Sequence, residues 1–175
     1  MHKDYDLQNL MSRLKKSDEH YSQLSKRLQI FYFILVPVYL LMLGRDIATG
    51  SETHEIIGSL FFLSGMVVFA LIFRSFSKSY RDVDYSLPTL QMLEKAVVRY
   101  TPFYNKFGAA MLAIAFVGGG LFFRSPSGES PWGILITFGV ALLMGMGVGL
   151  AIWWVKYKPL RDDALEIIKK IKEDL

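Results

Sequence analysis

Residues 132–155 read WGILITFGVALLMGMGVGLAIWWV, without a single charged side chain. A helix needs roughly 20 apolar residues to cross the hydrocarbon core of a bilayer, and this stretch meets that length. It is also more apolar than an ordinary core helix, which makes a soluble, fully buried helical bundle the weaker interpretation. The sequence therefore predicts a transmembrane helix here.

Three more uncharged stretches precede it, at residues 28–43, 56–73 and 107–123. They lie at the short end of the usual range of about 17–25 residues. Flanking aromatic and basic residues are expected to extend them into the interface. Unpaired backbone groups are costly in lipid, so stretches of this length are predicted as helices and not as barrel strands. We therefore predict an all-α integral membrane protein with four transmembrane helices arranged as two hairpins.

The basic residues predict the orientation of these helices. Eighteen of the 20 Lys and Arg residues lie in segments 1–27, 74–106 and 156–175, and the other two are Arg45 and Arg124. Lys and Arg are concentrated on the cytoplasmic side of membrane proteins, so both termini and the middle loop are predicted to be cytoplasmic. The net charge of +4 is thereby assigned to lipid headgroups and not to nucleic acid.

The segment before the first span has the pattern of an amphipathic helix. Leu7 and Leu14 are seven residues apart, and Leu10 and Leu24 occupy the companion position of the same seam. No Gly or Pro separates residues 1–27 from the first span, so one continuous helix is expected. These four leucines are the candidate seam for a helical bundle or for a docked partner.

Two more amphipathic helices are expected outside the membrane. One covers residues 87–100 of the middle loop, with Ser86 as the residue that caps its N-terminus. The other lies in the tail, 156–175, and Pro159 is expected to separate it from the fourth span of the 28–155 domain. In isolation, each of the three amphipathic helices would expose its apolar face to water. A small cytoplasmic bundle of all three is favoured over helices that lie flat on the lipid.

The sequence disfavours most kinds of catalysis. It contains no Cys, which excludes disulfides, thiolate metal sites and cysteine nucleophiles. No Asp, Glu, Lys, Arg or His lies inside any predicted span, and proton relays or ion-coupled transporters generally need such a residue. His54 stands among acidic residues of a short loop, but the spacing fits no metal-ligand pattern. No cofactor, metal site or catalytic residue is predicted.

Small residues mark one face of the fourth span. Ala141, Gly145 and Gly149 recur every four residues, and the third span contains Gly118, Gly119 and Gly120. Small residues let membrane helices approach closely. The face of Ala141, Gly145 and Gly149 therefore predicts packing inside one subunit, a subunit interface in a homo-oligomer, or the lining of a pore.

The middle loop contains the turn Asp82-Val83-Asp84-Tyr85-Ser86-Leu87-Pro88. With this turn and the charged N-terminal helix, the chain resembles small bacterial membrane proteins that have four transmembrane helices. The resemblance implies this layout in a bacterial inner membrane and no activity. The leading hypothesis is a non-enzymatic scaffold or regulatory subunit that binds a protein partner through its cytoplasmic helices. The alternative is a homo-oligomeric channel or passive transport protein.

Overall fold

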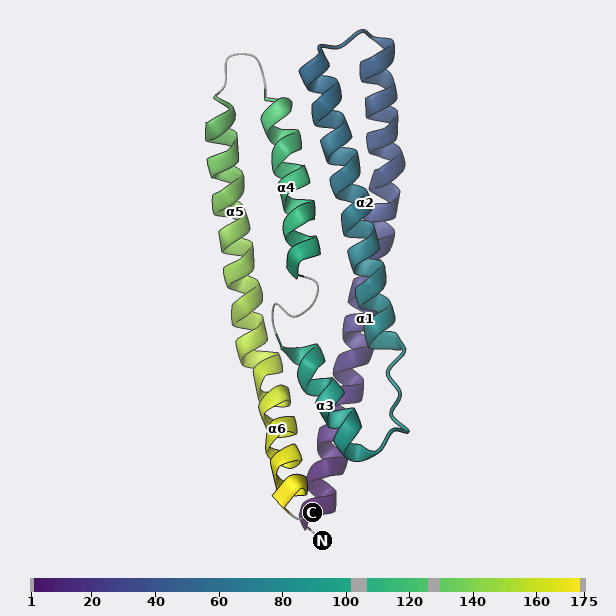
Figure 1. The fold of residues 1–175 in the computed structure, drawn as a ribbon, viewed down its shortest axis with the longest axis vertical. Helices are drawn as coiled ribbons and strands as arrows, with labels where there is room; N and C mark the ends of the chain where they lie inside the picture. The colour runs from purple at the N-terminus through teal and green to yellow at the C-terminus, as the bar shows by residue number, and fades with distance from the viewer. Residues whose placement is uncertain (1, 102–106, 126–129, 174–175) are drawn as a thin grey trace.

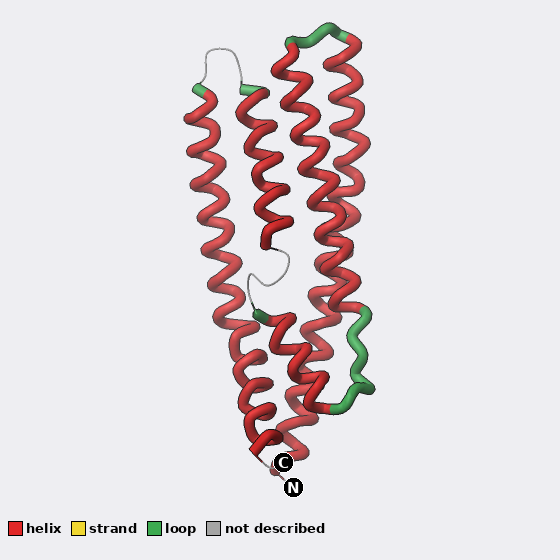
Figure 2. The backbone as a smooth tube through the Cα atoms, viewed as in Figure 1, coloured by secondary structure: helices red, strands yellow, loops and turns green. Residues whose placement is uncertain are grey.

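The computed structural model describes residues 2–101, 107–125 and 130–173, with side chains from Leu7 onward. Every regular element in these residues is helical (Figure 1, Figure 2), so the all-α prediction is confirmed for this part of the chain. The elements are α1 (His2–Ala48), α2 (Thr53–Arg81), α3 (Thr89–Tyr100), α4 (Phe107–Phe123), α5 (Pro131–Ile152), the π-helical turn η1 (Trp153–Tyr157) and α6 (Lys158–Glu173).

Helix α1 is one uninterrupted helix across the expected boundary at residue 27, as the absence of Gly and Pro there predicts. A tight turn reverses the chain into α2, and Gly50 adopts a φ of 67° that disfavours residues with a Cβ. The two helices then run side by side. The ring of Tyr32 stacks on those of Phe69 and Phe73, with centroids 5.1 and 5.4 Å away.

Helix α4 packs on the opposite side of α2 through glycines on both helices. A Cβ added at Gly58 of α2 would lie 3.2 Å from the carbonyl oxygen of Gly120 on α4. A Cβ added at Gly120 would lie 2.8 Å from the ring of Phe62. The backbones approach at a distance that larger residues would prevent, as is typical of helix pairs in membranes.

The chain does not break at Pro159, contrary to the prediction. Helices α5 and α6 are joined by η1 into one continuous helical rod (Figure 1). Proline has no N–H to donate to the carbonyl four residues earlier, and its ring crowds that carbonyl. The preceding turn widens instead, and the N–H of Lys158 donates to the carbonyl of Trp153, five residues back. The π turn accommodates the proline without ending the helix.

Helix α3 begins at Thr89, two residues later than predicted, and Ser86 does not cap it. The backbone N–H and the hydroxyl of Ser86 donate to the carboxylate of Asp84, at 2.9 and 2.6 Å. This local bond competes with helix capping and holds the segment as a turn. Pro88 then occupies the N-cap position.

Three helices are long and apolar enough to cross a membrane: α1, α2 and the continuous rod that begins with α5. The apolar helix α4 is shorter, at 17 residues. Figure 1 shows α5, α4, α2 and α1 side by side in that order. Described residues of α5 include no buried side chain, whereas α2 buries several. The main hydrophobic core does not lie among these apolar helices. It lies at the end of the molecule where the first part of α1 meets α3 and α6.

Candidate functional site

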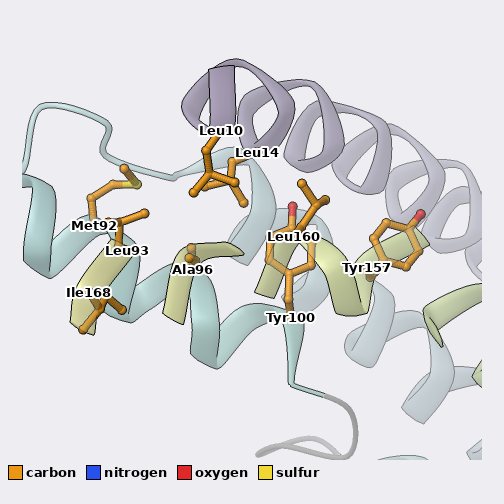
Figure 3. Close-up of a cluster of buried hydrophobic side chains, with 10 residues drawn as sticks. Leu10, Leu14, Met92, Leu93, Ala96, Tyr100, Tyr157, Leu160 and Ile168 are labelled. Atoms are coloured by element: carbon orange, nitrogen blue, oxygen red, sulfur yellow. The ribbon is translucent and has the colours of Figure 1, made fainter. Parts of the chain in front are cut away.

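The largest buried cluster joins α1, α3 and α6, and we call these packed segments the α1–α3–α6 bundle. Figure 3 shows the cluster, with the side chains of all three helices directed toward one another. Its members are Leu10, Leu14, Met92, Leu93, Ala96, Tyr100, Tyr157, Leu160, Ala164 and Ile168. The three amphipathic segments thus bury their apolar faces against each other within one chain.

The predicted leucine seam only partly follows this cluster. Leu10 and Leu14 are 3% and 0% exposed inside it, and Leu7 packs against it. Leu24 lies outside and is 44% exposed. At the level of Leu24, α1 lies beside α2 and not beside α3 and α6, and the buried residue there is Ser25. Because Leu10 and Leu14 are interior, a partner would contact other residues of the bundle.

A buried carboxylate lies next to this apolar cluster. Asp18 of α1 is 2% exposed. Its oxygens accept hydrogen bonds from the phenol of Tyr85 at 2.6 Å and the phenol of Tyr100 at 2.7 Å. The guanidinium of Arg99 donates a further bond at 3.0 Å and provides the opposite charge. A buried charge is stable only when it is paired and hydrogen-bonded, and Asp18 has both kinds of partner.

The two phenols remain hydrogen-bond donors at physiological pH. Burial raises the pKa of Tyr100 well above its ordinary value, and the negative charge of Asp18 raises it further. Burial and the hydrogen bond to Asp18 raise the pKa of Tyr85 in the same direction. Both oxygens of the Asp18 carboxylate already accept hydrogen bonds from these partners. The geometry of Asp18 therefore fits a structural role better than a catalytic one.

Tyr100 connects this network to the membrane-length rod. Its phenol donates to Asp18 of α1, while its backbone carbonyl accepts the indole N–H of Trp153 at 2.8 Å. The ring of Tyr100 also stacks on Tyr157, with centroids 6.1 Å apart. Both Trp153 and Tyr157 belong to η1, so the π turn presents two aromatic residues to the end of α3. One residue thereby links α1, α3 and the junction between α5 and α6.

The network around Asp18 was not predicted, although the sequence contains a signal for it. Asp18 stands four residues after Leu14 and three before Tyr21, so it lies on the apolar side of α1. A lone carboxylate at such a position indicates a buried partner. Tyr85 was noticed only as part of the turn at 82–88. Nothing in the sequence spacing identified Arg99 or Tyr100 as partners of Asp18, because they lie more than 80 residues away along the chain.

A second ion pair closes the opposite end of the molecule. Arg124, directly after α4, donates to Asp46 of α1 at 2.6 Å. The hydroxyl of Ser59 on α2 also donates to Asp46 at 2.6 Å, and Arg124 bonds to that hydroxyl as well. Asp46 and Ser59 are buried. The sequence places Arg124 outside the predicted spans but does not indicate this pair, which joins α1, α2 and the end of α4.

The small residues on this face of α5 are open in the described structure. A Cβ added at Gly145 or Gly149 would meet no described atom within 4 Å, and Ala141 is exposed. The close glycine contacts of the molecule lie instead between α2 and α4. No described side chain packs on Gly145 or Gly149, so this face of α5 is open to lipid or to another helix.

The described residues contain no group of three His, Asp or Glu side chains arranged to hold a metal ion. His54 forms an exposed contact with Glu52, with 3.2 Å between the ring nitrogen and the carboxylate. A cavity of about 340 Å³ lies beside Asp18, lined mainly by polar side chains of α1 and the 82–88 turn. Its buried carboxylate is already saturated by the donors described above.

Comparison with known proteins gives no match to any family model, to any curated protein or to any solved structure.

Proposed function

We propose that this chain is a non-enzymatic protein of a bacterial inner membrane that serves as a scaffold or regulatory subunit. Four helices cross the membrane, both termini are cytoplasmic, and the α1–α3–α6 bundle binds a protein partner. The strongly asymmetric distribution of basic residues supports this orientation. Of the 20 Lys and Arg residues, 18 lie in segments 1–27, 74–106 and 156–175, which form or adjoin the α1–α3–α6 bundle.

The fourth span in this proposal is α4. Its 17 residues extend about 26 Å at 1.5 Å per residue, slightly less than the roughly 30 Å of a hydrocarbon core. Helix α4 packs between α2 and α5, which both have the length of a full span. A short helix in that position is accommodated by its longer neighbours and by local thinning of the bilayer.

The buried network of Asp18 is the observation that carries the docking role. Buried ionic groups can fix one arrangement of packed helices at some cost in stability, and we adopt that hypothesis for this bundle. A bundle held in one arrangement presents a constant surface to a partner. Its exterior also carries two large apolar side chains, Val98 and Leu165, each 44% exposed.

Single cysteines will test the orientation, since the chain has none of its own. A cysteine at Thr53, the first residue of α2, is expected to react with a membrane-impermeant thiol reagent in intact cells. A cysteine at Ser12, in the bundle, is expected to react only after the membrane is opened. Labelling is measured by gel shift. The reverse pattern would show that the bundle is on the outer side.

Copurification in mild detergent, after crosslinking in cells, will test the docking role. The double variant Leu10→Glu/Leu14→Glu places charge in the core of the bundle and is expected to unfold it, while the spans stay inserted. A partner that is specifically crosslinked to the unchanged protein should then no longer be crosslinked or copurify. Gln8→Glu/Ser12→Glu adds the same charge at exposed positions of α1 and serves as the control for an intact bundle. Retention of the partner by the double variant, with the bundle shown to be unfolded, would contradict docking at the bundle.

The open face of α5 favours a second candidate, a homo-oligomeric channel or passive transport protein. Gly145 and Gly149 leave room for a close approach by another helix. Purified protein in liposomes distinguishes the two candidates. Saturable or ion-selective flux without any partner would support the channel and overturn the scaffold.

A further inference from the structure

Five basic residues lie where the row of apolar helices meets the α1–α3–α6 bundle. They are exposed, and none forms an ion pair with another described residue. The five are Lys26, Arg27, Arg74, Lys78 and Lys156. Elsewhere on the bundle many cations are paired, for example Arg13 with Asp163 at 2.9 Å. The boundary therefore carries positive charge that the described residues do not neutralise.

Three of these residues fall on one side of the pair formed by α1 and α2. Tyr21 of α1 and Tyr80 of α2 stack on each other, with ring centroids 5.0 Å apart. They mark the side of the α1–α2 pair that faces α3 and α6. At about 100° per residue, Lys26 stands about 140° round α1 from Tyr21. Arg74 and Lys78 stand about 120° and 160° round α2 from Tyr80. All three cations are thus directed away from the bundle.

The antiparallel pairing of the helices brings these cations to the same level. Ser22 of α1 and Ser77 of α2 exchange hydrogen bonds between hydroxyl and carbonyl at 3.4 Å. Lys26 follows Ser22 by one turn, and Arg74 precedes Ser77 by about one turn. Because the chains run in opposite directions, both steps lead toward the apolar part of the molecule. Lys26 and Arg74 therefore lie next to each other at its edge.

An exposed apolar strip continues from these cations along both helices. Ile30, one turn beyond Lys26, is 49% exposed. On α2, Leu71 and Val67 lie one and two turns beyond Arg74 and are 53% and 39% exposed. The same side of the molecule thus presents cations at its edge and apolar side chains farther in. This is the chemical order of a phospholipid, with its headgroup followed by its acyl chains.

We propose that Lys26, Arg74 and Lys78 form a binding site for the headgroup of an anionic phospholipid, whose acyl chain lies along Ile30, Leu71 and Val67. Arginine can donate two parallel hydrogen bonds to a phosphate, and lysine adds a point charge. A zwitterionic headgroup brings a cation of its own into this positive surrounding and is disfavoured. The site rests on the proposed insertion of α1 and α2 in a membrane, but not on the proposed docking of a partner.

Selective quenching by brominated lipids tests the site. A cysteine replaces Leu71 and carries a small fluorophore, and the protein is reconstituted in phosphatidylcholine vesicles that contain phosphatidylglycerol. Bromine is placed on the acyl chains of one lipid or of the other. The ratio of the two quenching efficiencies gives the enrichment of phosphatidylglycerol beside Leu71. We expect an enrichment of about five-fold or more, because three cations contribute to headgroup attraction. A fluorophore at Val148 of α5, which is 61% exposed, should report about equal amounts.

Two sets of substitutions control for charge and for folding. Lys26→Gln/Arg74→Gln/Lys78→Gln is expected to lower the ratio at Leu71 to that of the bulk lipid. Lys15→Gln/Lys16→Gln/Lys95→Gln removes the same charge from exposed positions of the bundle and should leave the ratio unchanged. The exchange Lys26→Arg/Arg74→Lys/Lys78→Arg keeps the charge and should retain the enrichment.

Three results would overturn the site: an unchanged ratio in the first variant, an equal loss in the bundle variant, or loss of enrichment when inorganic phosphate is added at constant ionic strength. The last result would mean that the cations bind free phosphate. Resistance to alkaline extraction, measured on the same vesicles, reports insertion separately. A protein that is extracted refutes the membrane proposal, whereas an inserted protein without enrichment refutes the lipid site alone.

Discussion

Replacing Asp18 with alanine is expected to destabilise the α1–α3–α6 bundle by about 3–5 kcal/mol, the usual cost of breaking a buried ion pair. The Asp18 side chain is 2% exposed and that of Arg99 is 15% exposed. The variant leaves the Arg99 cation without its counter-charge and removes the acceptor of two buried phenols. The hydrophobic cluster alone must then hold α3 against α1.

Hydrogen exchange of the α3 amides in detergent micelles will measure this effect, because bundle opening exposes them. Asp163→Ala is the matched control. Asp163 also joins α6 to α1 through an arginine, Arg13, but these side chains are 44% and 48% exposed. Exposed pairs contribute about 0–1 kcal/mol. Equal protection of α3 in the Asp18 variant and in the Asp163 control would mean that the buried network does not hold the bundle.

Gly120→Leu is expected to separate α4 from α2 and to destabilise the apolar helices by about 1–3 kcal/mol or more. Even a Cβ at this position would lie 2.8 Å from the ring of Phe62. Phe62 also stacks on Tyr39 of α1, with centroids 5.5 Å apart, so the ring has little freedom to move away. The measurement is thermal unfolding of the purified protein in detergent.

Gly145→Leu provides the control in a helix of similar composition. No described atom lies within 4 Å of a Cβ at Gly145, so the fold of one subunit should keep its stability. If both variants unfold at the same temperature, the contact between α2 and α4 is less tight than described. The subunit count of the Gly145 variant is informative in addition, because a decrease would place a second copy of the chain on this face of α5.

The sequence predicted the helices more successfully than their contacts. Uncharged stretches located the apolar helices, because exclusion of charge is a local property of the chain. The absence of Gly and Pro before residue 28 predicted the continuity of α1. Pro159 misled the same reasoning, since a π turn can absorb a proline that an α-helix cannot. Local rules do not determine which of these two responses a helix makes.

The site could be predicted only in part for a related reason. Periodicity identified Leu10 and Leu14 as residues of one face, but it could not show that α1 changes its neighbours before Leu24. Spacing likewise placed Gly145 and Gly149 on one face and gave no information about what contacts them. The partners of Asp18 lie 67, 81 and 82 residues along the chain. A pairing of that range depends on the fold as a whole and not on any local pattern.

These sequence separations impose an order on biogenesis. Asp18 is synthesised early and leaves the ribosome as a solvated carboxylate, long before Arg99 and Tyr100 exist. Helix α2 is also synthesised before α3, so the carboxylate gains its partners only after both long helices have been made. The other wall of the cluster comes from α6, whose core residues Leu160, Ala164 and Ile168 are among the last to be made. The first helix to be synthesised therefore completes its packing only after α5 and α6 have been made.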